Sequence, residues 1–126
     1  MTVVLDASAL LALLWSEPGS EAVAAIMEDA VVSAVNWAEI ISKLQERGIV
    51  LDVARPMLNE LPVTVLPFDR ELAEAAGALR METRHLGLSI GDRACLALAA
   101  QLGVPAYTAD KAWAKLECGV EVVVVR

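Results

Sequence analysis

The sequence is poor in the residues that build disulfides, zinc sites and histidine-based catalytic sites. It has two cysteines and one histidine in 126 residues, and aromatic residues make up 4%. Cys95 and Cys118 lie far apart and form no CxxC pair, so we expect two buried, reduced thiols. His85 has no second histidine to work with. The shortage of aromatic residues means that aliphatic and alanine side chains must fill the core.

Basic residues are also scarce, because ten lysines and arginines face 17 acids and give a net charge of −7. Passive binding to nucleic acid needs a basic face, so we expect no direct DNA binding. An acidic enzyme can still act on a polyanion if bound cations supply the positive charge. The composition therefore excludes a simple nucleic-acid coat and leaves a metal-dependent enzyme open.

Long apolar runs are missing as well, although 57% of the residues are hydrophobic. A membrane span needs roughly 18 consecutive apolar residues, and no run reaches that length. No basic region precedes the apolar start, so the chain does not begin like a signal peptide. We expect a single domain over residues 1–126, located in the cytoplasm.

Short apolar runs alternate with segments of helical periodicity along the whole chain. Strands are predicted at Val3–Leu5, Val31–Val32, Pro62–Leu66, Pro105–Thr108 and Glu121–Val125. Helices are predicted at Leu10–Trp15, Gly19–Glu28, Asn36–Gly48, Leu51–Asn59, Asp69–Gly87, Ile90–Leu102 and Asp110–Leu116. This alternation is typical of a parallel sheet that is covered by helices on both faces. The predicted fold is α/β, a three-layer α/β/α sandwich around a mostly parallel five-stranded sheet.

Four acids stand near predicted strand ends or helix starts. Asp6 follows the first strand, Asp110 follows the fourth, and Asp92 lies in the first turn of an apolar helix. Each of them could simply cap a helix, and Glu39 could complete a cap at Asn36. Glu39 also lies off the apolar stripe of its helix and is equally consistent with a solvated side chain. Taken singly, these positions leave capping and function open.

Taken together, the four acids predict a cation site. In a doubly wound sheet, strand ends and helix starts share one edge, and ligands bind where the strand order reverses. Asp6 and Asp110 should follow neighbouring strands there, and carboxylates that converge in a partly apolar crevice repel one another strongly. Mg²⁺ or Mn²⁺ prefers oxygen ligands and would relieve that repulsion. Such a site suits phosphoryl chemistry.

Three segments of the chain resemble a known family. The segments VVLDASALLALLWSEPG, SAVNWAEIISKL and LSIGDRACLALAAQLGVPAYTAD resemble, in that order, motifs of PIN-domain ribonucleases, best of all the short VapC-type toxins of bacterial toxin–antitoxin pairs. The resemblance implies a Mg²⁺- or Mn²⁺-dependent endoribonuclease acting on structured RNA, tRNA or rRNA. It implies in-line hydrolysis that leaves a 5′-phosphate and a 3′-hydroxyl. Asp6, Asp92 and Asp110 would bind the metal, and Glu39 would complete the catalytic acids.

The same resemblance assigns supporting residues. Ser8 and Thr108 would orient carboxylates or water. Arg93 and Lys111, each beside a site acid, could hold RNA phosphates. Both are equally consistent with surface charges or ion pairs.

Two kinds of protein partner are also implied by the resemblance. One is a small antitoxin that threads an apolar and basic peptide along a groove near Trp15, Val23, Trp37 and Ile41. The acidic net charge suits such a peptide. The other is a second copy of the chain in a homodimer.

A non-catalytic α/β domain that binds protein or RNA, either PIN-like or receiver-like, is the alternative. Receivers also gather acids around Mg²⁺ at strand ends. They need an acid pair near the start, however, and this chain has only Asp6 there. The Asp-x-Asp pattern of phosphatases fails at the same place, because Ser8 occupies its third position.

Overall fold

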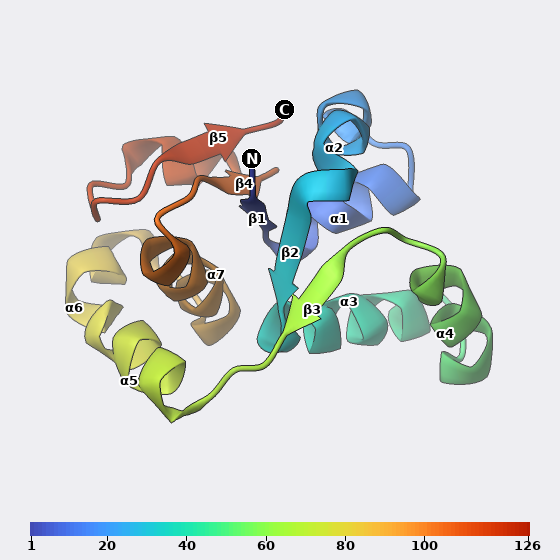
Figure 1. The fold of residues 1–126 in the computed structure, drawn as a ribbon, viewed down its shortest axis with the longest axis horizontal. Helices are drawn as coiled ribbons and strands as arrows, with labels where there is room; N and C mark the ends of the chain where they lie inside the picture. Colours follow the sequence, from blue (N-terminus) through green and yellow to red (C-terminus); the bar gives the residue numbers. More distant parts are fainter.

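The computed structural model describes residues 1–126 (Figure 1). The strands are β1 (Val3–Leu5), β2 (Ala30–Ser33), β3 (Thr64–Leu66), β4 (Ala106–Thr108) and β5 (Val122–Val124). The α-helices are α1 (Ala7–Leu14), α2 (Ser20–Ile26), α3 (Ala34–Glu46), α4 (Leu51–Asn59), α5 (Arg70–Ala78), α6 (Arg80–Thr83) and α7 (Ile90–Leu102). Short 3-10 helices are η1 (Met27–Asp29), η2 (Arg84–Leu86) and η3 (Lys111–Lys115). None of the helices has both the length and the apolar surface needed to cross a membrane.

The five strands form one sheet in the order β3-β2-β1-β4-β5, and every pairing is parallel. From β1 the chain builds outward through β2 and β3, then returns to the other side of β1 with β4. The strand order therefore reverses between β1 and β4, where Leu5 pairs with Tyr107. The carboxyl ends of these two strands lie side by side and carry Asp6 and Asp110 to one edge. The predicted doubly wound sheet is confirmed.

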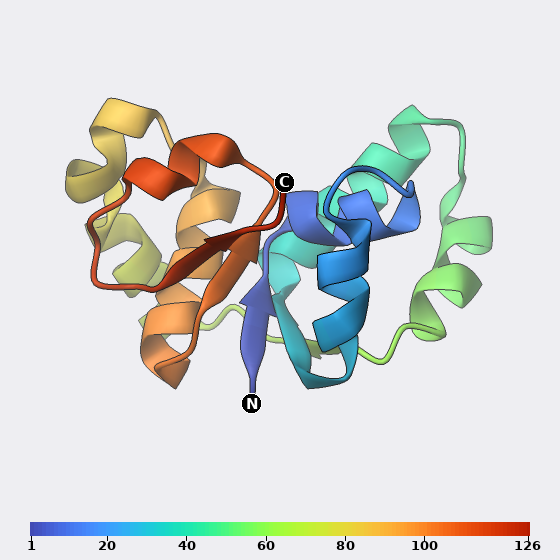
Figure 2. The ribbon, with the colours of Figure 1, turned by 90° about the horizontal axis from the view of Figure 1, so that it is seen from above.

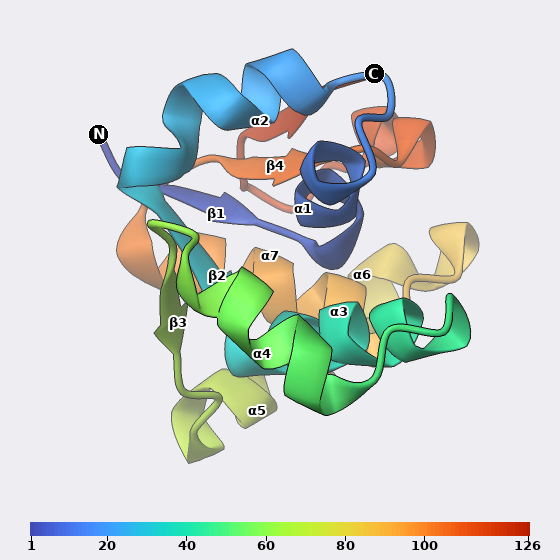
Figure 3. The same cartoon turned by 90° about the vertical axis from the view of Figure 1, so that its right-hand side faces the viewer.

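Alternate residues of β1 divide the core between the two faces of the sheet. Val3 and Leu5 pack into one cluster with residues of α1, α2, α3 and α4, whereas Val4 packs into the other with residues of α5 and α7. A central strand that is apolar without alternation is covered on both sides. Each of these side chains is at most 1% exposed, and full burial of a Val or Leu contributes about 1.5–3 kcal/mol. Figures 2 and 3 show the resulting three layers.

Two helix predictions agree with the structure in both bounds. These are Leu51–Asn59 and Ile90–Leu102, and Gly103 ends the latter in the left-handed conformation with φ 66°. Both cysteines are free, as expected, but only Cys95 is buried, and Cys118 is partly exposed.

The prediction that Asn36 caps a helix is wrong. The helix begins at Ala34, and its cap is Ser33, whose Oγ accepts from the Val35 N–H at 3.2 Å. Asn36 is instead a buried residue of the first turn, 1% exposed.

The single long helix predicted from Asp69 to Gly87 is also wrong. It is broken into α5, α6 and η2. At the end of α6 the buried Thr83 donates its hydroxyl proton to the Leu79 carbonyl at 2.8 Å, and this carbonyl also accepts from the Thr83 N–H at 3.1 Å. A threonine that bonds back to the i−4 carbonyl in this way often bends a helix.

The predicted partner groove also needs correction, because Val23 is fully buried in the core and cannot line a groove.

Candidate active site

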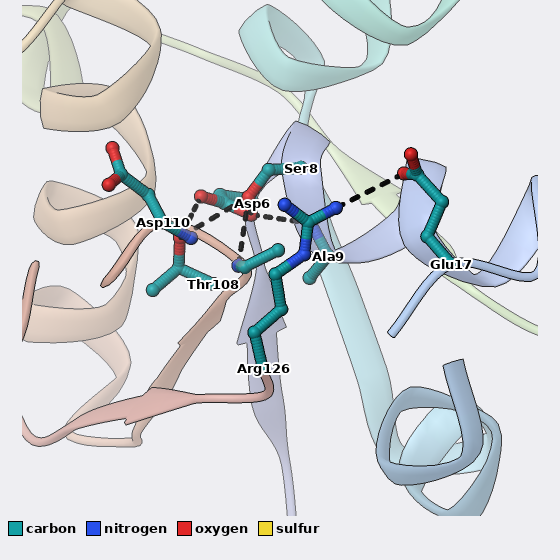
Figure 4. A network of polar contacts seen from close by, with 8 residues as sticks. Asp6, Ser8, Ala9, Glu17, Thr108, Asp110 and Arg126 are labelled. Carbon is teal, nitrogen blue, oxygen red and sulfur yellow. Dashed lines mark hydrogen bonds and ion pairs between the residues drawn. The ribbon is translucent and has the colours of Figure 1, made fainter. Parts of the chain in front are cut away.

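Asp6 is a buried carboxylate held by three hydrogen bonds. It follows β1 directly and caps α1, and only 3% of the residue is exposed. Its Oδ1 accepts from the Ala9 N–H and from Ser8 Oγ, both at 2.8 Å, and its Oδ2 accepts from Thr108 Oγ1 at 2.5 Å (Figure 4). The capping interpretation of Asp6 is therefore correct. A cap needs only the bond from the Ala9 N–H, so the hydroxyls of Ser8 and Thr108 are two additional donors, and they fix the direction of the carboxylate.

Ser8 and Thr108 connect Asp6 to the backbone that follows β4. The Ala109 N–H donates to Ser8 Oγ at 2.9 Å, and the Asp110 N–H donates to Thr108 Oγ1 at 3.0 Å. With backbone donors on their oxygens, the two hydroxyls point their own protons at Asp6. The structure thus places both predicted supporting residues in direct contact with the carboxylate they were expected to orient.

The electrostatic surroundings of Asp6 are unfavourable for its charge. Burial raises the pKa of Asp6 from 3.8 to about 6, the hydrogen bonds from Thr108, Ala9 and Ser8 lower it, and the charge of Asp92 raises it further. No basic side chain forms an ion pair with Asp6. A pKa difference of this size means that keeping Asp6 ionised lowers the free energy of unfolding by roughly 3 kcal/mol.

The raised pKa of Asp6 predicts that, without divalent metal, the stability of the fold depends on pH. The folded chain holds the Asp6 proton with a pKa of about 6 against 3.8 unfolded, so it binds more protons between these values. Stability from this group should therefore rise as the pH falls through 6, by roughly 1 kcal/mol between pH 7 and 5. Urea unfolding in EDTA measures it, with Asp6→Asn as the reference that lacks the effect. Equal pH profiles for the two proteins would contradict the assigned pKa.

Glu39, on α3, lies against the start of α7, where it contacts Asn36 and Gly91. The Asn36 Nδ2 donates to Glu39 Oε1 at 3.2 Å and to the Gly91 carbonyl at 3.1 Å. A Cβ on Gly91 would stand 1.6 Å from Glu39 Oε1, so only glycine leaves room for this carboxylate. Burial first, and then the charge of Asp92, raises the pKa of Glu39. The side chain is half-buried, and the interpretation of Glu39 as a solvated residue is wrong.

Asp92 combines a cap with a free carboxylate oxygen. Its Oδ2 accepts from the Ser89 N–H at 3.0 Å, and its own N–H donates to Ser89 Oγ at 3.2 Å, which completes a capping box. The predicted capping pair is confirmed. Oδ1 accepts no hydrogen bond from the chain and is free to bind a ligand.

Three of the four acids lie near enough to one buried thiol for their charges to act on it. Burial raises the pKa of Cys95 most, and the charges of Asp6, Asp92 and Glu39 raise it further. Cys95 lies in the second turn of α7, so these carboxylates gather around the start of that helix. Asp110 is not among them. It is exposed, and its Oδ1 accepts from the Ala112 N–H at 2.9 Å to cap η3.

The two predicted phosphate-binding residues differ in their surroundings. Arg93 is directed at α5, where its Nη1 donates to the Ala76 carbonyl at 3.1 Å. Lys111 is exposed and lines a hollow of about 650 Å³ together with Asp110 and Arg126. Of the two, only Lys111 faces a space that a substrate could enter.

The donor set fits a hard divalent cation in its chemistry. In this structure no three Asp, Glu, His or Cys side chains already form a group that could hold an ion. The charge of Asp92 nevertheless raises the pKa of both Asp6 and Glu39, and Asp92 itself offers a free oxygen. Oxygen donors with an excess of negative charge suit Mg²⁺ or Mn²⁺.

Three residues beside the acids were not predicted from the sequence as part of the site. Asn36 showed only a capping pattern, and Gly91 showed no phosphate-binding motif. Arg126, which pairs with Glu17 at 3.3 Å near Ser8, carried no sequence signal.

The chain matches the family model described as PIN domain over residues 3–117. A comparison with curated proteins finds no match. Among solved structures, the chain is similar to a toxin–antitoxin complex from Klebsiella pneumoniae (TM-score 0.77, 20% identity, 99% of this chain and 98% of that one). It is also similar to DNA-bound VapBC from Salmonella typhimurium (TM-score 0.73, 17% identity, 100% and 99%). A third similar structure is VapC20 of Mycobacterium tuberculosis, a Sarcin-Ricin loop cleaving toxin (TM-score 0.70, 19% identity, 95% and 99%).

Proposed function

Because this chain belongs to the PIN-domain family, we propose that it is an endoribonuclease that uses Mg²⁺ or Mn²⁺ to hydrolyse phosphodiester bonds in structured RNA. The observation that carries the proposal is the group of Asp6, Glu39 and Asp92, because the charge of Asp92 raises the pKa of the other two and all three act on Cys95 in α7. Asp6 has no basic partner, and a charge buried in this way needs a compensating cation. The receiver-like alternative does not agree with the family, whereas a PIN domain that binds without cutting remains the competing function.

Each acid has a distinct part in the proposed site. Asp6 and Asp92 are the proposed principal metal ligands, with Glu39, which lies over Gly91, as the third acid. Asp110 lies apart from these three at the start of η3 and would act on the metal through water. A bound Mg²⁺ or Mn²⁺ would neutralise these charges, activate a water and polarise the phosphoryl group. Ser8 and Thr108 hold Asp6 in one orientation, which reduces the movement needed on binding.

We propose tRNA or rRNA as the substrate class and the cytoplasm as the place of action. One structural neighbour is described as cleaving the Sarcin-Ricin loop, and this supports a structured RNA target. The net charge of −7 gives no support to direct DNA binding by this chain.

A nuclease assay tests the proposal. The protein freed of metal with EDTA should not cut tRNA or rRNA fragments, and added Mn²⁺ or Mg²⁺ should restore cutting. The products should carry a 5′-phosphate and a 3′-hydroxyl, which end-specific ligation and tailing detect. An exposed acid on α4 supplies the control, because Asp52→Asn should cut at the wild-type rate. Cutting that resists EDTA would overturn the metal requirement, and binding without cutting would favour the non-catalytic alternative.

We further propose that the protein is a toxin neutralised by a small antitoxin. The neighbours that are toxin–antitoxin complexes support this partner. A hollow of about 190 Å³ lies between α3 and α4. Its lining consists of four apolar residues and two polar ones, namely Trp37, Ile41, Leu51, Leu58, Arg55 and Asn59. An apolar anchor of a peptide fits these walls. The pairing predicts a small open reading frame next to the gene, and coexpression with it should relieve the growth arrest that this chain causes. The absence of such a reading frame, or arrest that persists, would count against the pairing.

A homodimer is proposed from the surface between α5 and α7. This hollow of about 430 Å³ has an apolar floor that includes Leu72, Leu79 and Ala97, with Glu71 and Glu82 beside it. Apolar surface of this kind commonly meets a partner. Light scattering at micromolar concentration tests the dimer, and a pure monomer would contradict it.

A further inference from the structure

Two hollows open close to Asp6 and Asp110, one lined by Ser8, which contacts Asp6, and the other by Asp110 itself, and they have only Arg126 in common. One, of about 350 Å³, opens beside Ser8 and extends past Lys43 and Arg47. The other, of about 650 Å³, holds Asp110 and Lys111. Arg126 lines both hollows, and its side chain lies next to Ser8 and Thr108, which hold Asp6 (Figure 4).

The backbone next to Arg126 is fixed to the same strand end that holds the site. The Val125 N–H donates to the Thr108 carbonyl at 2.8 Å, while the Thr108 hydroxyl holds Asp6. On the other side, Val125 packs against Gly19, where a Cβ would stand 2.7 Å from its Cγ2. Gly19 has φ 99°, so glycine is favoured there for its conformation as well. Figure 3 shows this end of the chain beside the segment that joins α1 to α2.

The guanidinium of Arg126 is held in place and remains accessible. Its Nη2 lies 3.3 Å from Glu17 Oε1, and 36% of the side chain is exposed. A guanidinium has five N–H donors in a planar fork, and one contact to a carboxylate leaves most of them free. Such a fork matches the geometry of a phosphate.

Basic residues are concentrated in these two hollows. Four of the ten lysines and arginines line them, namely Lys43, Arg47, Lys111 and Arg126. The Arg47 guanidinium carbon lies 3.6 Å from the centroid of the Trp15 ring, and Lys43 Nζ lies 3.6 Å from Glu46 Oε2. These contacts hold both basic side chains at the hollow. Three acids, Glu17, Glu46 and Asp110, line the same hollows, so basic residues outnumber acidic ones there by one, in a chain of net charge −7. This local excess of positive charge favours the approach of a polyanion.

We propose that Arg126 binds a phosphate next to the scissile one, with the RNA strand running from the Lys111 hollow across the acids to the Lys43 and Arg47 hollow. This inference rests on the proposed nuclease function and deepens it by giving the path of the substrate. Arg126 acts in binding and takes no part in the chemical step. Glu17 keeps the fork aimed at the path when no RNA is bound.

The test compares Arg126→Gln with Arg80→Gln, a substitution of an exposed arginine on α6 that lines neither hollow. With a tRNA substrate in Mn²⁺, Arg126→Gln should raise KM about 10-fold and change kcat little, because one phosphate contact is lost in ground and transition state alike. Arg126→Lys should recover part of the loss. Thermal stability and Mn²⁺ affinity should stay at wild-type values, which separates a binding role from a structural one.

Salt dependence supplies a second readout that needs no cleavage. In an Asp92→Asn background, affinity for a fluorescent tRNA fragment is measured between 50 and 200 mM salt, about the range over which phosphate contacts are read. Loss of Arg126 should reduce the slope of log K against log salt by about 1, and loss of Arg80 should not.

An active wild type whose Arg126→Gln variant keeps both the wild-type KM and the wild-type salt slope overturns this inference and leaves the proposed nuclease function intact. RNA binding with an Arg126-dependent slope but no cleavage by wild type supports the path and overturns the nuclease. Weaker antitoxin binding with unchanged RNA affinity would assign Arg126 to the protein partner and overturn the inference.

Discussion

Asp6→Asn should reduce RNA cleavage at least about 10³-fold and leave the fold intact, because the substitution removes the charge that a metal ion needs and keeps the shape. An asparagine oxygen can still accept from the Ala9 N–H and from Ser8 Oγ, the two donors to Oδ1. Its amide nitrogen would face Thr108 Oγ1, and that hydroxyl can turn to accept instead of donate. The backbone N–H of Asp110 can continue to donate to the same oxygen.

The Asp6→Asn variant should also be at least as stable as wild type in EDTA at pH 7, because it no longer buries a charge whose pKa is about 6. Circular dichroism and urea unfolding report the fold, and calorimetric titration with Mn²⁺ should show weaker binding. Asp69→Asn is the matched control. Asp69 caps α5 by accepting from the Leu72 N–H at 2.9 Å, and asparagine caps a helix equally well. If Asp6→Asn cuts RNA at the wild-type rate, Asp6 does not belong to the site.

The positions of Asp6 and Asp110 at one edge could be predicted from the sequence because they depend on strand order. Short apolar runs separated by helical segments give a parallel sheet, and the sheet carries both residues to the reversal point between β1 and β4. Local pattern was also sufficient for Asp92, since Ser89 three residues earlier forms the predicted capping box. These features follow from neighbours in sequence or from the topology of the whole chain.

The position of Glu39 could not be predicted in this way, because it depends on a contact between two helices. Asn36 and Gly91 are 55 positions apart, and their hydrogen bond brings α3 onto the start of α7. Nothing in the local sequence distinguishes a buried Asn36 from an N-cap, since both place asparagine three residues before an acid. Likewise, Asp110 resembles the other three acids in sequence but lies apart from them, because its carboxylate caps η3 and remains exposed.

Gly91→Ala is expected to reduce RNA cleavage about 100-fold, the second largest effect predicted for a single substitution. Within the first turn of a helix, alanine is normally as good as glycine or better. Here the new Cβ would lie 1.6 Å from Glu39 Oε1, so the flexible Glu39 side chain must turn away while the backbone stays. A misplacement of about 1 Å in a reacting group can cost roughly 10²-fold in rate.

Gly77→Ala supplies the matched control, because it adds the same methyl group within α5, where nothing lies within 4 Å of the new Cβ. That variant should keep full activity and gain up to about 1 kcal/mol of stability. A double-mutant cycle then tests the cause. If Gly91 acts through Glu39, the Gly91→Ala substitution should cost almost nothing in a Glu39→Gln background, where the carboxylate is already lost. Additive losses in the double variant would show that Gly91 affects the site by another route, and a fully active Gly91→Ala protein would remove Glu39 from the group of acids around α7.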